Sequence, residues 1–224
     1  MVDTKAVRIT RLIAIPAVIT LGVTILRLVG EFAHWSPLFF SSAPGGGLAI
    51  VGISWLPIIF GPYFALKLVD AGSGPPSTAK AIILTLLGLM VFFLGGLDAA
   101  TTAAHPSYLT MAGFVLMLAS AFVPGIGWKS LGTALLAYAF VARIPVLIVM
   151  YFTMTANGGA GAGTHYDKVA PVLAHLPFAS KFFYAAIVPQ MTLWIGWTVV
   201  LGALVGTIVT AVARPKKDAA PAAA

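Results

Sequence analysis

The arginine at position 143 is the residue of this chain that most clearly needs a chemical partner. It lies in the middle of an apolar run, about 18–21 Å from either end at 1.5 Å per residue. A central arginine costs about 2.5–3.5 kcal/mol on membrane-insertion scales, so a carboxylate, carbonyls, water or a ligand must offset that cost. Pro145 cannot donate to the carbonyl of Val141, which leaves an acceptor beside the guanidinium. The pattern predicts either a structural arginine tied to protein groups or a ligand or ion site.

Few other polar residues lie deep in apolar runs. Gln190 stands beside Pro189, and Asp98 ends another run. Glu31 follows Arg27 by four residues, so the two share one helix face and can pair. We predict that Arg143 faces the bundle interior and contacts a carboxylate or carbonyls from another helix, with Asp98 or Glu31 as the expected acid and Gln190 as a neighbour. The candidate ligand or ion site therefore comprises Arg143, Gln190, Asp98, Glu31 and Arg27.

Motifs for catalysis or metal binding are weak. The chain has no cysteine, which excludes thiolate nucleophiles, disulfides and iron–sulfur clusters. Its four histidines do not have the spacing of three or four that places two metal ligands on one helix face, and His-Glu-x-x-His is absent. They are His34, His105, His165 and His175. No catalytic residue, metal ligand or cofactor is therefore predicted.

The composition is that of a membrane protein. The chain is 60% hydrophobic and 8% charged, with a mean hydropathy of +1.01, whereas soluble domains carry about 25% charged residues. The net charge of +7 does not indicate nucleic-acid binding, because the basic residues are spread over several loop ends. The lipid bilayer is the expected surrounding partner.

Because a crossing needs roughly 20 apolar residues, the fold class predicted is an all-α, polytopic membrane protein with six transmembrane helices. The predicted spans are 9–32, 47–69, 79–98, 108–128, 131–155 and 182–213. They make residues 1–214 a single transmembrane domain. Residues 215–224 are an alanine-rich segment that we expect to be a disordered cytoplasmic tail.

The basic residues fall on alternate loops. One side has Lys5, Arg8, Arg11, Lys67, Lys80, Lys129, Arg214, Lys216 and Lys217, and the other has only Lys168 and Lys181. Cytoplasmic loops carry the excess of Lys and Arg. Both termini are therefore expected in the cytoplasm, with the protein in the plasma or inner membrane.

Small residues form a stripe along the last span, with a spacing of four. They are Thr198, Gly202, Gly206 and Thr210. Such stripes let a second helix approach closely. We expect a packing seam here, either within the bundle or with a second copy or partner subunit.

These patterns favour binding or transport of a small solute or ion through the bundle, with Arg143 at the site. A non-catalytic accessory or scaffold subunit is the first alternative, in which Arg143 is structural and the stripe meets a partner. The second is a membrane enzyme acting on a lipid or lipid-soluble substrate at the outer face. A connected cavity reaching Arg143 would favour the first interpretation.

Overall fold

The secondary structure is entirely helical in the part of the chain that the computed structural model describes, residues 8–47 and 49–213. The all-α prediction is confirmed there, while the predicted tail at 215–224 lies outside the described residues. The elements are α1 (Ile9–Phe32), α2 (Pro37–Phe40), η1 (Pro44–Gly46), α3 (Pro57–Asp70), α4 (Thr78–Thr102), α5 (Tyr108–Ser120), α6 (Val123–Gly127), α7 (Lys129–Gly159), η2 (His165–Asp167), η3 (Pro171–Leu173), α8 (Phe178–Phe182), the π-helical turn η4 (Phe183–Ile187), α9 (Val188–Met191) and α10 (Leu193–Ala213).

Five helical stretches of the described residues are long and apolar enough to cross a membrane. They are Ile9–Phe32, Thr78–Thr102, Tyr108–Gly127, Lys129–Gly159 and Phe178–Ala213. Each overlaps one of the predicted spans, with ends that agree to within four residues. Large apolar side chains point outward from them, and Ile15, Ile83 and Phe152 are 66%, 65% and 66% exposed. Such a surface suits hydrocarbon rather than water, as expected of a helical protein embedded in a membrane.

The predicted span 47–69 is wrong in its first part, because α3 begins only at Pro57. The 14 residues of α3 extend about 21 Å. Gly45, Gly46 and Gly47 all have positive φ and turn the chain before this point. Proline is favoured at the first helical position, where its missing N–H costs no hydrogen bond. Residues 49–56 therefore form an irregular segment, with Trp55 Nε1 donating to the carbonyl of Ile50 at 2.8 Å.

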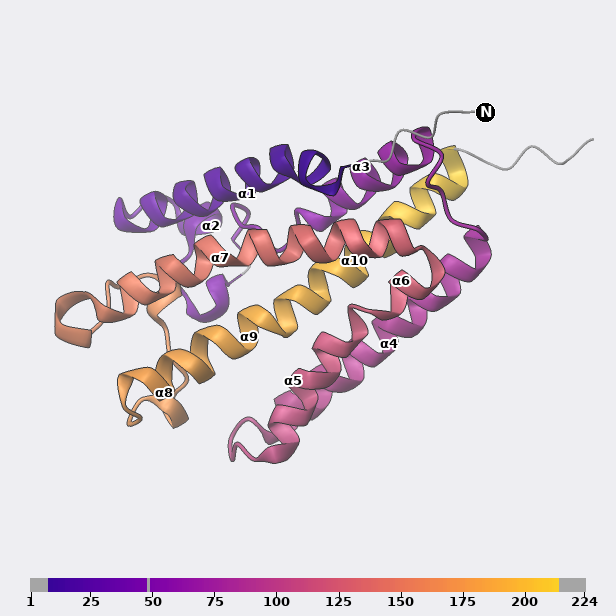
Figure 1. The fold of residues 1–224 in the computed structure, drawn as a ribbon. Coiled ribbons are helices and arrows are strands. Elements are labelled where there is room, and N and C mark those ends of the chain that lie inside the picture. Colours follow the sequence, from indigo (N-terminus) through magenta and orange to yellow (C-terminus); the bar gives the residue numbers. More distant parts are fainter. Residues whose placement is uncertain (1–7, 48, 214–224) are drawn as a thin grey trace, which may run out of the picture.

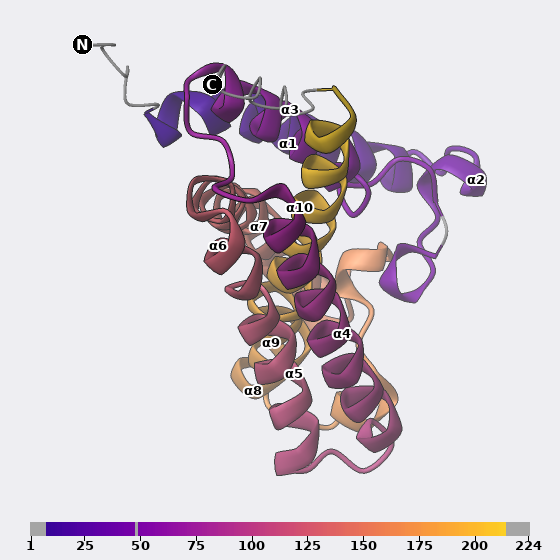
Figure 2. The ribbon, with the colours of Figure 1, turned by 90° about the vertical axis from the view of Figure 1, so that its right-hand side faces the viewer.

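The long helices form three groups. Figures 1 and 2 show α1 and α3 on one side, α4 and α5 on the opposite side, and α7 and α10 between them. The core lies where these groups meet and includes the fully buried side chains of Phe64, Tyr138, Leu135 and Ile195. The Tyr138 hydroxyl is also 2.7 Å from Thr20 Oγ1, which joins α7 to α1.

The small-residue stripe of α10 lies inside the bundle, where α10 crosses α3. A Cβ added to Gly61 would collide with the backbone of Gly202, and one added to Gly206 would lie 2.7 Å from the carbonyl oxygen of Gly61. Thr198 and Thr210 are also buried. The stripe is thus the contact surface between α3 and α10. Assembly with a second subunit stays a prediction, and it would need another surface.

Candidate anion-binding site

A cavity of about 250 Å³ lies between α1, α7, α9 and two loops, and it reaches Arg143. It is lined by Val23, Thr24, Arg27, Gly45, Gly46, Gly47, Ala49, Gly52, Ile53, Ser54, Arg143, Val146, Met150, His165, Tyr166, Lys168, Ala185, Pro189, Gln190 and Trp194. Lys168 and Gly47 are exposed and mark its loop end. Arg143 and Gln190 belong to its helical end.

The guanidinium of Arg143 is buried and poorly satisfied. Its side chain is only 3% exposed. Nη1 is 3.4 Å from Gln190 Oε1, and Nη2 is 3.4 Å from Thr198 Oγ1. Both distances exceed the 2.7–3.2 Å usual for N–H···O hydrogen bonds. Nε has no hydrogen-bond partner at all.

Aromatic contact supplies part of the stabilisation of this charge. Cζ of Arg143 lies 5.0 Å from the centre of the Trp194 ring. An aromatic face attracts a cation, and a desolvated pair of this kind contributes about 2 kcal/mol. This attraction leaves the N–H donors available, because it acts through the ring face rather than through hydrogen bonds.

Two interruptions of helical geometry occur beside Arg143. Pro145 lies inside α7 and leaves the carbonyl of Val141 without its usual donor. In the helical segment that faces α7, the π turn η4 leads into Pro189. Thr192 then breaks the helix, with φ −120° and ψ −74°. This break separates α9 from α10, so Gln190 and Thr198 approach Arg143 from two different helical segments. The broken backbone is what positions both side chains around one guanidinium.

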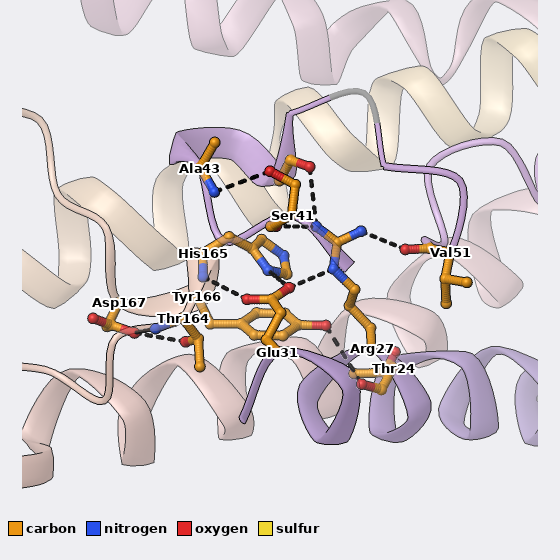
Figure 3. Close-up of polar contacts among 11 residues, drawn as sticks. Thr24, Arg27, Glu31, Ser41, Ala43, Val51, Thr164, His165, Tyr166 and Asp167 are labelled. Carbon is orange, nitrogen blue, oxygen red and sulfur yellow. Dashed lines mark hydrogen bonds and ion pairs between the residues drawn. The ribbon is translucent and has the colours of Figure 1, made fainter. Parts of the chain in front are cut away.

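Arg27, by contrast, donates hydrogen bonds from all three of its guanidinium nitrogens. Nε pairs with Glu31, and Nη1 donates to the carbonyl of Val51. Nη2 donates to the carbonyls of Ser41 and, at 3.0 Å, Gly46. Figure 3 shows the guanidinium between Glu31 on α1 and the loop that follows α2. The predicted Arg27–Glu31 pair is present, and it anchors this loop over the cavity.

Glu31 also binds the second loop of the cavity, which connects α7 to α8 and contains His165. The backbone N–H of His165 donates to Glu31 Oε2 at 2.7 Å, and its ring Nδ1 contacts Oε1. A carboxylate only accepts hydrogen bonds, so Nδ1 must carry the hydrogen of this contact. Glu31 is 5% exposed, and its charge is shared between Arg27 and His165 (Figure 3).

A rigid turn holds His165 in this position. Asp167 accepts hydrogen bonds from the backbone N–H and the hydroxyl of Thr164, at 2.7 and 2.6 Å. Tyr166 packs against the His165 ring, with 3.8 Å between ring centres. Burial and the nearby charge of Glu31 raise the pKa of Tyr166, and its hydroxyl lies 3.5 Å from the Thr24 carbonyl oxygen, which is long for a hydrogen bond. This turn thereby forms part of the wall at the loop end of the cavity.

The electrostatic character of the cavity is basic. Its lining includes Arg27, Arg143, His165 and Lys168, and no Asp or Glu is among the described residues that form its wall. Since Glu31 already pairs with Arg27 and His165, the Arg143 charge has no acidic partner within ion-pair distance in the described part of the chain. The arrangement is suited to binding an anion through N–H donors.

The predicted site residues are only partly brought together. Arg143 and Gln190 meet as expected, and Arg27 lies in the same cavity. The expected acidic partner is wrong: Glu31 contacts Arg27 and His165 instead, and Asp98, at the far end of α4, is not part of the cavity wall. Sequence reasoning missed His165, Tyr166, Trp194 and Thr198 as cavity or guanidinium contacts. The position of His165 on a predicted outer loop was the only available signal.

No protein-family model matches the chain, and neither does any curated protein or solved structure.

Proposed function

We propose that this chain crosses the cell membrane six times, with both termini in the cytoplasm, and binds a small anion at Arg143. The anion carries a carboxylate or phosphate group, enters from the outer face and is bound near the middle of the membrane. Binding of this kind is the first step of transport through the bundle.

The six-crossing topology is supported by the distribution of charge over the helix ends. Arg8, Arg11 and Lys80 lie at the starts of α1 and α4, and Lys67 lies near the end of α3. In Figure 1 these ends lie on the opposite side of the bundle from the α4–α5 connection and α8. The sixth crossing consists of the irregular segment 49–56 together with α3. Irregular backbone at membrane depth is tolerated where it lines a cavity, and Ala49, Gly52, Ile53 and Ser54 do so.

The observation that carries the anion proposal is the buried Arg143 guanidinium, with an unpartnered Nε and two long contacts, in the wall of a cavity whose described lining has no acidic residue. An uncompensated buried charge is strongly destabilising. A carboxylate or phosphate fits the planar array of donors through two parallel hydrogen bonds. If the arginine only joined helices, it would be expected to resemble Arg27, whose three guanidinium nitrogens all donate to protein acceptors.

Transport is supported by the broken helix beside the site. Many transporters bind solutes near the bilayer midplane, where discontinuous helices expose backbone polar groups to the cavity. Here the interruptions at Thr192 and Pro145 flank Arg143 from two sides.

The test is ligand-dependent stabilisation of the purified full chain in nanodiscs of neutral phosphatidylcholine. Thermal unfolding is measured against butanoate and inorganic phosphate at constant ionic strength. A ligand at a hundred times its Kd stabilises a protein by about 2.7 kcal/mol. We expect at least one of these anions to raise the Tm of the wild type, with saturation.

Arg143→Leu should abolish this rise, and Arg143→Lys should weaken it, because a point charge replaces a planar fork of donors. Lys181→Gln, which removes a positive charge outside the cavity, should respond like the wild type. An equal rise in Arg143→Leu would refute the proposed site.

A further inference from the structure

A second, apolar cavity adjoins the basic one. It is a groove of about 410 Å³ whose wall includes Trp55, Phe92, Met117, Leu193, Trp197 and Leu201. Trp55 and Ile58 on its rim are 39% and 48% exposed, whereas Met117 is 1% exposed. The groove therefore extends from the apolar outer surface of the bundle inward to Met117.

Ser54 and Trp194 line both cavities. Trp194 lies next to the Arg143 guanidinium, with 5.0 Å from its ring centre to Cζ, and also forms part of the apolar groove. Trp197 fixes the other part of this shared wall, because its Nε1 donates to the Ser54 carbonyl at 2.7 Å. A basic cavity and an apolar groove thus meet at one indole ring.

We infer that the ligand is a single-chain amphiphile, whose anionic head binds at Arg143 and whose apolar chain lies across Trp194 in the groove. The inference rests on the proposed function, since it assigns the class of anion bound at Arg143. The shared chemistry is an acidic head on an alkyl chain, and the head is either a carboxylate, as in a fatty acid, or a phosphate.

The polarity of the two cavities supports this ligand. The basic cavity holds an anionic head, and the wall of the groove is almost entirely apolar. A lipid chain alone would have little preference for the groove over the bilayer, which is equally apolar. Joining the chain to the head makes its insertion an intramolecular step, so the two contacts reinforce each other.

Gly96 offers a way to block the groove without touching the basic cavity. It lies on α4 in the groove wall, and a Cβ added there meets only Met117 Sδ, at 3.9 Å. Gly96→Leu can therefore place its side chain in the groove without a backbone clash. Gly22→Leu is a matched control, since Gly22 is also inside a long helix and a Cβ there meets nothing within 4 Å.

The experiment compares ligands of equal charge and different chain length on the full chain in neutral-lipid nanodiscs. The probes are butanoate, decanoate and decyl phosphate, with decyltrimethylammonium as a cation of the same chain length. Affinity is measured by thermal shift against the free aqueous ligand concentration. We expect decanoate or decyl phosphate to bind at least tenfold more tightly than butanoate, and the ammonium compound to give no saturable shift that depends on Arg143.

In Gly96→Leu the gain from the longer chain should fall by roughly tenfold or more, about what burial of two methylenes contributes, while butanoate affinity stays unchanged. Gly22→Leu should behave as the wild type. The ratio of decanoate to decyl phosphate affinity then distinguishes a carboxylate head from a phosphate head.

Two results would overturn the inference and leave the proposed function standing. One is equal affinity for butanoate and the ten-carbon anions. The other is an unchanged chain-length effect in Gly96→Leu, for instance because a second copy covers the groove, which a concentration-dependent dimer in detergent would reveal. If no anion of either length stabilises the protein through Arg143, the proposed function fails as well.

Discussion

Glu31 on α1 accepts a hydrogen bond from the backbone N–H of His165, a residue 134 positions later in the chain. The same carboxylate pairs with Arg27, which holds the loop containing Ser41 and Gly46. One acidic side chain therefore fixes both loops that line the loop end of the cavity. The positions of these loops depend on the contacts among Glu31, Arg27 and His165 rather than on packing of the long helices.

Removing the charge of Glu31 alone should destabilise the protein more than replacing both members of the Arg27–Glu31 pair. Glu31→Gln leaves the buried Arg27 guanidinium without its carboxylate, which we expect to cost roughly 3–5 kcal/mol. The double variant Arg27→Met/Glu31→Leu should lose less, because no charge remains buried. Chemical unfolding of both variants in one detergent measures the difference. A double variant at least as unstable as Glu31→Gln would contradict this account.

Replacing Pro145 should separate stability from ligand binding. Pro145→Ala restores an N–H that can donate to the Val141 carbonyl, which contributes about 1 kcal/mol to the stability of the folded state. In the more regular helix the Arg143 guanidinium should be less well positioned to bind the anion. Anion-dependent stabilisation should therefore decrease. Thermal unfolding with and without butanoate or phosphate reports both quantities. Val146→Ala, at the neighbouring cavity position, serves as the control for a local change that keeps the proline.

The α3–α10 seam should be intolerant of one additional methyl group. Gly61→Ala places a Cβ against the backbone of Gly202, and we expect a loss of about 1–3 kcal/mol from overpacking. Gly22→Ala adds the same group to an exposed position on α1 and should be neutral or slightly stabilising, because alanine favours a helix interior. Equal unfolding temperatures for the two variants would mean that α3 and α10 are not in backbone contact.

The proposed topology is testable by cysteine labelling, because the natural chain has no cysteine. Ala174→Cys, in the exposed segment before α8, should react with a membrane-impermeant maleimide in intact cells. Gly74→Cys, between α3 and α4, should react only after the membrane is opened. Labelling of Gly74→Cys alone in intact cells would reverse the orientation. Labelling of both positions would refute the three crossings, by α4, α5–α6 and α7, that separate Gly74 from Ala174.

Sequence reasoning predicted the features that depend on local composition. The five long helices follow from apolar runs, and the burial of Arg143 follows from the cost of its charge in lipid. The start of α3 at Pro57 was missed, because an apolar run such as 47–69 does not reveal where an irregular segment is stabilised by its tertiary contacts. The His165–Glu31 contact was not predictable either, since it joins two loop ends through the packing of α1 against α7.

Close backbone contact at Gly61, Gly202 and Gly206 has a mechanical consequence for the last helix. With no side chain between them, α3 and the C-terminal part of α10 cannot slide past each other without separating. The break at Thr192 lies beyond this seam, toward Arg143 and the loops. The seam therefore fixes α10 to α3, whereas α8 and α9 lie on the other side of the break and take no part in this contact. Gln190 and Thr198, the two side chains nearest the Arg143 donors, thus come from opposite sides of this break, and only Thr198 belongs to the helix that is fixed to α3.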